Sequence, residues 1–178
     1  MTNGPKKPRV VVMGGSLGGL TAAITLRDVG CDVTVFERSS APLTGRGAGI
    51  VLNPATVRCF STRPGFDLRS LSFGPRWMRY LNQQGETSHQ APCEYRFSSY
   101  DALYRGLLDC FEGGAYRLGT AVVGFEQDAE SVNVRLTDGH AVCCELLVCA
   151  DGILSMARRE LLPGCRQPTL ATSPGGGP

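Results

Sequence analysis

A glycine-rich loop that directly follows a short apolar run constrains the fold of this chain more than any other feature. The apolar run is Val10 to Met13, and its β-branched side chains indicate a buried parallel strand. The loop after it consists of Gly14, Gly15, Ser16, Leu17, Gly18 and Gly19. In this pattern Gly14 permits a tight turn, the small Ser16 lets the backbone approach a diphosphate, and Gly19 lets a helix pack closely on the strand. The loop therefore predicts a phosphate-binding turn, although Ser16 stands where the usual pattern has a second glycine.

The residues after the loop predict a helix and then a second strand. Leu20, Ala23 and Ile24 have helical spacing, and Gly30 supplies a stop signal at the C-terminal end. The stretch from Cys31 to Phe36 is expected to form the second strand, which a right-handed crossover would place parallel to the first. We therefore expect an α/β, Rossmann-like fold in which the N–H groups that open the helix face a phosphate.

An acidic residue follows the second strand. Glu37 lies 23 residues beyond Gly14, where a carboxylate can accept hydrogen bonds from both hydroxyls of an adenosine ribose and would repel a 2′-phosphate. Arg38 alone would suggest a 2′-phosphate instead, but we interpret it as the solvated residue after a strand. These residues predict that an adenine dinucleotide binds, and they leave FAD and NAD equally possible.

The remaining sequence alternates between weak and strong structural signals. Residues 41–56 are rich in glycine and proline but contain one apolar string, Ala48 to Leu52, that predicts a strand. Residues 59–94 predict loops and short elements. Ser98 and Asp101 have capping-box spacing and predict a helix from about Ser99 to Phe111. Further strands are expected at Ala121–Phe125, Val132–Leu136, Ala141–Cys144 and Leu146–Ala150, and Asp138-Gly139 predicts an antiparallel hairpin between the second and third of these.

Composition excludes several classes of function. The net charge is only +2 and the Lys and Arg residues are scattered, so no nucleic-acid partner is expected. No stretch approaches the roughly 20 apolar residues of a membrane span, and no secretory signal is recognisable. The eight cysteines form no C-x-x-C pair and only two histidines are present, so we expect no metal site and a cytoplasmic protein with free thiols.

Two segments carry a resemblance to a known family. Val10 to Ser39, followed by Gly45 to Leu52, resembles the FAD-dependent aromatic hydroxylases, the group A flavin monooxygenases. Within that group, the loop and Ala48-Gly49-Ile50 are most similar to members that hydroxylate hydroxypyridines. Leu147 to Ile153 is similar to the family's Asp-Gly motif, although the family usually has glycine where Cys149 stands and arginine where Leu154 stands.

The resemblance implies a cofactor, a reaction and three further site residues. FAD would be reduced by NAD(P)H and would carry one oxygen atom of O₂ to a small aromatic substrate, so no side chain is predicted to be catalytic. Asp151 would lie near the diphosphate, Arg46 beside the isoalloxazine ring, and Arg105 would reach toward the flavin. The alternatives are that Asp151 only caps the next helix and that Arg105 is only an exposed helix residue.

The resemblance also implies an incomplete enzyme. We expect residues 1–165 to form the FAD-binding portion, with part of an incomplete substrate domain inserted around residues 59–97, and residues 166–178 to be a disordered tail. The family's later Gly-Asp motif does not occur after Gly152, so a truncated chain with little or no activity alone is expected. Two alternatives stay open. A nicotinamide-dependent dehydrogenase would continue its parallel sheet directly after Glu37, and a non-catalytic remnant would bind nucleotide weakly or not at all.

Overall fold

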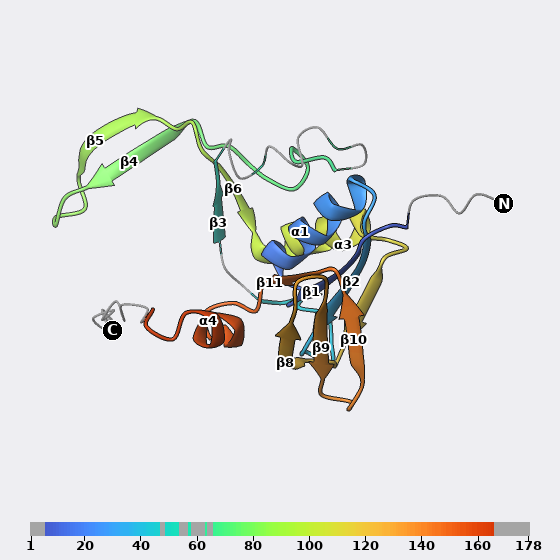
Figure 1. Ribbon diagram of the computed structural model, residues 1–178. Helices are drawn as coiled ribbons and strands as arrows, with labels where there is room; N and C mark the ends of the chain where they lie inside the picture. Colours follow the sequence, from blue (N-terminus) through green and yellow to red (C-terminus); the bar gives the residue numbers. More distant parts are fainter. Residues whose placement is uncertain (1–5, 47–48, 54–56, 58–62, 64–65, 166–178) are drawn as a thin grey trace.

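A parallel sheet forms the centre of the computed structural model, which describes residues 6–46, 49–53, 57, 63 and 66–165. Its four strands within these residues have the order β11-β1-β2-β7 and are all parallel. Their bounds are β1 Arg9–Met13, β2 Asp32–Glu37, β7 Ala115–Leu118 and β11 Leu146–Cys149. The predicted Rossmann-like parallel sheet with its crossover helix is therefore confirmed (Figure 1).

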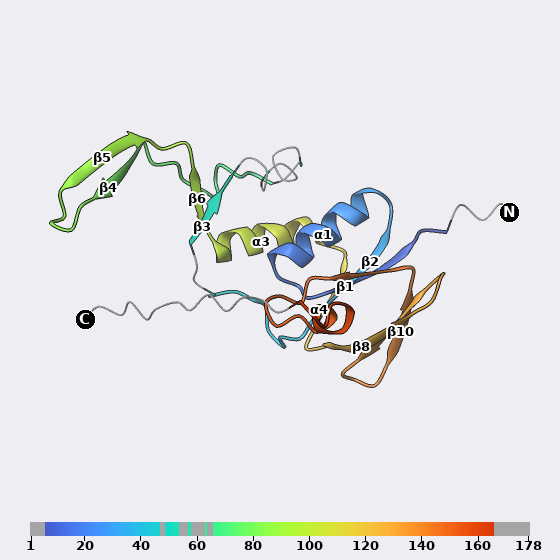
Figure 2. The same cartoon turned by 60° about the vertical axis from the view of Figure 1, so that its left-hand side comes forward.

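The alternation of side chains along β1 separates two hydrophobic layers. Val10 and Val12 face α1 (Leu17–Asp28) and α3 (Tyr100–Cys110), and they are at most 2% exposed. Val11 and Met13 face the other way, into a second cluster with side chains of β8 and β9. Both faces of the sheet are thus covered, which is why β1 is apolar from Val10 to Met13 without polar alternation. Figure 2 shows α1 and α3 on one side of the sheet and β8 and β10 on the other.

The second layer is the predicted hairpin with one more strand. β8 (Val122–Gln127), β9 (Val132–Leu136) and β10 (Ala141–Cys144) form an antiparallel sheet in the order β10-β9-β8. Gly139 has φ +85°, as the turn between β9 and β10 requires. The hairpin prediction is therefore confirmed.

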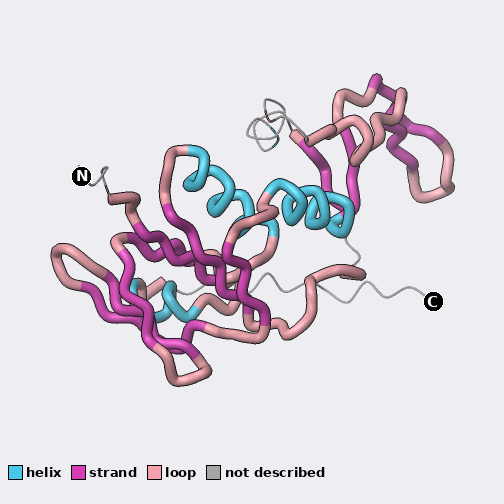
Figure 3. Tube along the Cα trace, turned by 90° about the vertical axis from the view of Figure 1, so that its right-hand side faces the viewer, coloured by secondary structure: helices cyan, strands magenta, loops and turns pink. Residues whose placement is uncertain are grey.

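The region predicted as loops and short elements, residues 59–94, contains two strands in its described part, and a third strand follows it. β4 (Trp77–Leu81) and β5 (Thr87–Pro92) form a hairpin, and β6 (Arg96–Ser99) pairs with β3 (Gly49–Leu52). The β4–β5 hairpin projects away from the rest of the protein in Figures 1 and 3. Most of its side chains are exposed, so neither strand carries the apolar alternation from which a strand is predicted.

The sequence analysis missed one strand, and one of its expectations needs correction. β7 was not predicted, although it continues the parallel sheet beside β2. The N-cap of α3 is Ser99, whose hydroxyl oxygen accepts the N–H of Ala102 at 3.1 Å, whereas the Ser98 hydroxyl donates to the carbonyl of Leu71.

The predicted tail, residues 166–178, lies outside the described residues, as does Ala48 of the predicted third strand. None of the helices in the described part of the chain is long and apolar enough to cross a membrane.

Candidate functional site

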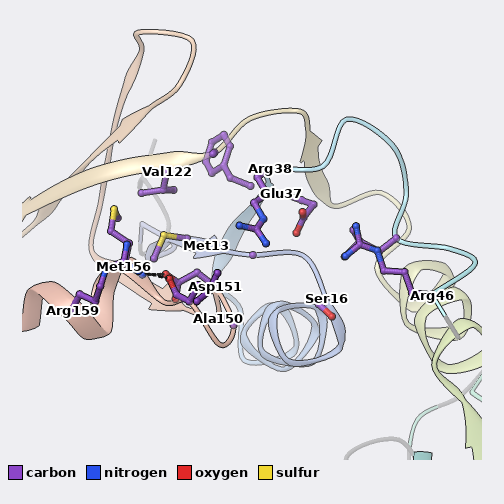
Figure 4. A pocket seen from close by; sticks show the side chains of 16 residues that line it. Met13, Ser16, Glu37, Arg38, Arg46, Val122, Ala150, Asp151, Met156 and Arg159 are labelled. Atoms are coloured by element: carbon purple, nitrogen blue, oxygen red, sulfur yellow. Dashed lines mark hydrogen bonds between the residues drawn. The ribbon is translucent and has the colours of Figure 1, made fainter. Parts of the chain in front are cut away.

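A cleft of about 340 Å³ opens where β1, β2 and β11 end. The carboxyl ends of parallel strands meet at one edge of a sheet, which is where ligands bind in open α/β folds. Six of the predicted site residues line this cleft: Gly14, Ser16, Glu37, Arg38, Arg46 and Asp151 (Figure 4). Residues separated by more than 130 positions in the sequence are thus brought to one site.

The glycine-rich loop has the backbone geometry that its sequence predicts. Gly14 has φ +98°, and a Cβ atom there would lie 2.4 Å from the Ala150 carbonyl oxygen. A Cβ atom on Gly19 would lie 1.8 Å from the Gly14 carbonyl oxygen, so α1 could not approach β1 as closely with any other residue. The predicted roles of Gly14 in the turn and of Gly19 in helix packing are confirmed. Gly18 has no atom within 4 Å of its would-be Cβ.

Among the residues that the structure describes, none supplies an acceptor for the N–H groups that open α1. The first intrahelical bond runs from Leu20 N–H to the carbonyl of Ser16, and within the described residues no acceptor pairs with the amides of residues 17–19. Ser16 is the N-cap residue, but its hydroxyl does not cap the helix and instead lies 2.8 Å from the Tyr100 hydroxyl. These amides and the positive end of the helix dipole are therefore available to an anion.

Glu37 is a buried carboxylate at the end of β2. It is 6% exposed, its Oε2 accepts the N–H of Gly15 at 2.8 Å, and its Oε1 accepts the N–H of Ser39 at 2.9 Å. Each carboxylate oxygen can accept a second hydrogen bond, and Glu37 lines the cleft. The side chain therefore ties the loop to β2 and can still accept bonds from a ligand.

Three guanidinium groups border the cleft. Arg38 follows Glu37, Arg46 lies in the segment after β2, and Arg159 comes from α4 (Met156–Leu161). Figure 4 places Arg38 between Glu37 and Met13, with Arg46 on the far side of Ser16 and Arg159 on the opposite side of the cleft. Three positive groups against the two carboxylates of Glu37 and Asp151 give the lining one net positive charge, which favours an anion.

Arg105 is not among the residues that line the cleft. Its Nε donates to Asp101 Oδ2 at 2.8 Å, one helical turn away, and its side chain is 62% exposed. The other oxygen of Asp101 accepts the N–H of Gly45 at 2.9 Å. The hydrogen bond from Arg105 has the larger effect and the one from the Gly45 N–H the smaller, and together they lower the pKa of Asp101 below its ordinary value. Arg105 thus supports the segment that carries Arg46, and its contact with a flavin stays a prediction.

Asp151 has a structural partner as well as a place in the cleft. Its Oδ2 accepts the N–H of Met156, the first residue of α4, at 2.6 Å. Gly152 has φ +80°, which turns the chain sharply after β11. The capping interpretation of Asp151 is therefore supported by geometry, and its contact with a ligand stays a prediction.

Several residues around the site had no signal in the sequence. Tyr116 in β7 donates to the Gly15 carbonyl at 2.9 Å, and its hydroxyl lies 3.1 Å from that of Tyr104. Tyr100 holds the Ser16 hydroxyl, and Arg159 is brought in by α4. Ser155 accepts the Arg158 N–H as the N-cap of α4, so this serine could have predicted the helix. No feature of the neighbouring sequence identifies the three tyrosines as residues near the site.

Comparison with known proteins agrees with this geometry. The model of the family described as "FAD binding domain" matches residues 7–168. The chain is 41% identical over 159 residues to 2,6-dihydroxypyridine 3-monooxygenase of Paenarthrobacter nicotinovorans, covering 89% of this chain and 40% of the relative. It is 32% identical over 165 residues to the FAD-dependent urate hydroxylase of Klebsiella pneumoniae, covering 86% of this chain and 43% of that relative.

Solved structures give the same result. The structure of 2,6-dihydroxypyridine-3-hydroxylase from Arthrobacter nicotinovorans superposes with a TM-score of 0.81 at 40% identity, over 90% of this chain and 41% of that one. A Klebsiella pneumoniae HpxO variant complexed with FAD gives a TM-score of 0.78 at 29% identity, over 90% of this chain and 44% of that one. The chain thus spans 40–44% of the length of these proteins. It belongs to the FAD binding domain family, and the relatives that it matches are FAD-dependent monooxygenases, a class of oxidoreductases.

Proposed function

We propose that the chain binds FAD in the cleft, with the diphosphate on the amides that open α1 and the adenosine ribose on Glu37. One observation carries this proposal: in the described part of the chain the amides of residues 17–19 have no acceptor, and the Ser16 hydroxyl, which lies 2.8 Å from the Tyr100 hydroxyl, does not cap them. A helix end without a cap needs a partner, and a diphosphate supplies acceptor oxygens.

The residues present fit this cofactor. Gly14 and Gly19 let backbone approach where a Cβ atom would collide, and the positively charged lining suits a diphosphate. The free acceptor positions on Glu37 suit the two ribose hydroxyls, and its charge disfavours a 2′-phosphate. Arg38, Arg46 and Arg159 would contribute charge to diphosphate binding from the rim of the cleft.

We further propose that the chain is the FAD-binding part of a monooxygenase that hydroxylates an aromatic or heteroaromatic ring with NAD(P)H and O₂. The names of the relatives support this reaction class, and their pyridine and purine substrates favour a nitrogen heterocycle. Bound FAD supplies the redox chemistry, and the residues of this chain bind and orient it. Met13, Phe36 and Val122 contribute apolar side chains to the lining of the cleft.

The test is a titration of the purified chain with FAD, followed by flavin fluorescence. The wild-type chain should bind FAD, and Glu37→Ala should weaken binding by about ten- to a hundredfold, since hydrogen bonds to a charged group contribute about 1.5–3 kcal/mol. Glu112→Ala, which removes an exposed carboxylate beyond α3, is the matched control and should leave the affinity unchanged. Absence of FAD binding by the wild-type chain would overturn the proposal, and an unchanged affinity in Glu37→Ala would remove Glu37 from the site. Stronger binding of NADH than of FAD would favour the dehydrogenase alternative.

A further inference from the structure

The peptide groups of Gly15 are held from both sides. Glu37 Oε2 accepts the Gly15 N–H at 2.8 Å, and the Tyr116 hydroxyl donates to the Gly15 carbonyl at 2.9 Å. These partners come from the neighbouring strands β2 and β7. The peptide group is planar and trans, so fixing the Gly15 carbonyl also fixes the Ser16 N–H, which points the opposite way.

The contact with Tyr116 explains the residue type at position 15. A Cβ atom on Gly15 would lie 2.2 Å from the Tyr116 hydroxyl oxygen and 2.6 Å from its Cζ atom. The fingerprint of this loop leaves the second position open to any residue. Here the Tyr116 ring occupies the space that a side chain would need, so tyrosine at position 116 requires glycine at position 15.

Tyr116 is held as a hydrogen-bond donor. Its hydroxyl lies 3.1 Å from that of Tyr104, whose side chain is fully buried and whose ring stacks on Tyr100. Burial raises the pKa of Tyr116, the contact with Tyr104 raises it further, and the negative charge of Glu37 acts in the same direction. The phenol therefore stays protonated across the physiological pH range and donates to Gly15.

We propose that Tyr116 is a positioning residue of the diphosphate site: its hydroxyl orients the peptide between Gly15 and Ser16, so that the amides opening α1 face the diphosphate. The inference rests on the proposed FAD binding and extends it to a residue that contacts only the loop. The Tyr104 hydroxyl contacts the Tyr116 hydroxyl and helps to hold it in place. Tyr100 contributes separately, because its hydroxyl bonds to the Ser16 hydroxyl, which therefore does not cap the helix.

The test compares Tyr116→Phe with the wild-type full chain. Removal of the hydroxyl should raise the Kd for FAD by about three- to tenfold, the effect of one net hydrogen bond. The ³¹P resonances of bound FAD should also move, which a loss of global stability would not cause. Tyr95→Phe, which removes a hydroxyl from a half-exposed ring far from the loop, is the matched control and should change neither quantity.

A steric variant adds an independent readout. Gly15→Ala should weaken FAD binding more in the wild-type background than in Tyr116→Leu, because the smaller side chain removes the ring that the new Cβ atom would meet. Equal losses in the two backgrounds would overturn the coupling between positions 15 and 116. If Tyr116→Phe binds FAD like the wild type with unchanged ³¹P resonances, the positioning role is wrong.

A measurement on the free chain tests the role of Tyr116 even if the proposed binding of FAD is wrong. If the wild-type chain binds no FAD, hydrogen exchange in the free chain still decides whether Tyr116 anchors the loop. Exchange of the Gly15 amide should become about three- to tenfold faster in Tyr116→Phe, because the loop opens more easily without one net hydrogen bond. An unchanged exchange rate would overturn the anchoring role.

Discussion

Two adjacent glycines in the loop should respond to the same substitution in opposite directions. A Cβ atom on Gly19 would lie 1.8 Å from the Gly14 carbonyl oxygen and 3.4 Å from Val12 Cγ1. To reach an ordinary contact distance, the start of α1 would have to move by about 1.6 Å from β1. A Cβ atom on Gly18 meets nothing within 4 Å.

The expected magnitudes follow from these contacts. Gly19→Ala overpacks the junction between helix and strand, which costs about 1–3 kcal/mol of unfolding free energy. Gly18→Ala should stabilise the chain by up to about 1 kcal/mol, because alanine has the higher helix propensity and the position is exposed. In a chain of this size, 1 kcal/mol changes Tm by about 2–4 °C.

Thermal unfolding by circular dichroism and FAD titration together form the assay. Gly18→Ala should melt at or above the wild-type temperature, whereas Gly19→Ala should melt lower than the wild type and bind FAD more weakly than the wild type. If Gly19→Ala matches Gly18→Ala in Tm and the wild type in affinity, α1 does not depend on close contact with β1, and the explanation of the loop is wrong.

Two further predictions concern stability away from the cleft. Arg9, through its side chain and its backbone N–H, lowers the pKa of Glu145 from 4.5 to about 2. A depressed carboxyl pKa stabilises the folded state above the unfolded pKa, so the advantage of the wild type over Glu145→Gln should disappear as pH falls from about 4.5 to about 2. Urea titrations at several pH values measure the difference in unfolding free energy between the wild type and Glu145→Gln. A difference that does not change with pH would contradict the pairing of Arg9 with Glu145. Ser99→Ala should destabilise the chain by about 1 kcal/mol through loss of the α3 cap, and a change below about 0.3 kcal/mol would speak against Ser99 as the N-cap.

The sequence predicts the centre of the fold well because the signals there are local. The apolar run of β1, the glycines of the loop and the periodicity of α1 are contiguous, so the strand, turn and helix follow from the residues themselves. Glu37 could be placed because its spacing from Gly14 reflects the length of one helix, α1, and one strand, β2.

The elements that were missed depend on distant partners. β7 has four residues, and its assignment rests on pairing with β2 across about eighty positions. Tyr116 therefore had no signal, since its contact with Gly15 exists only when β7 lies beside β2. Two consecutive serines precede α3, and only the structure separates the cap, Ser99, from the neighbour that bonds elsewhere.

The most direct measurement is an amide NMR titration of the isotope-labelled chain with FAD. Because the amides of residues 17–19 have no acceptor in the described part of the chain, their resonances should move downfield as FAD binds, together with that of Ser16. Amides on the exposed β4–β5 hairpin should not move. Binding of FAD with no change at residues 16–19 would contradict the claim that the start of α1 receives the diphosphate.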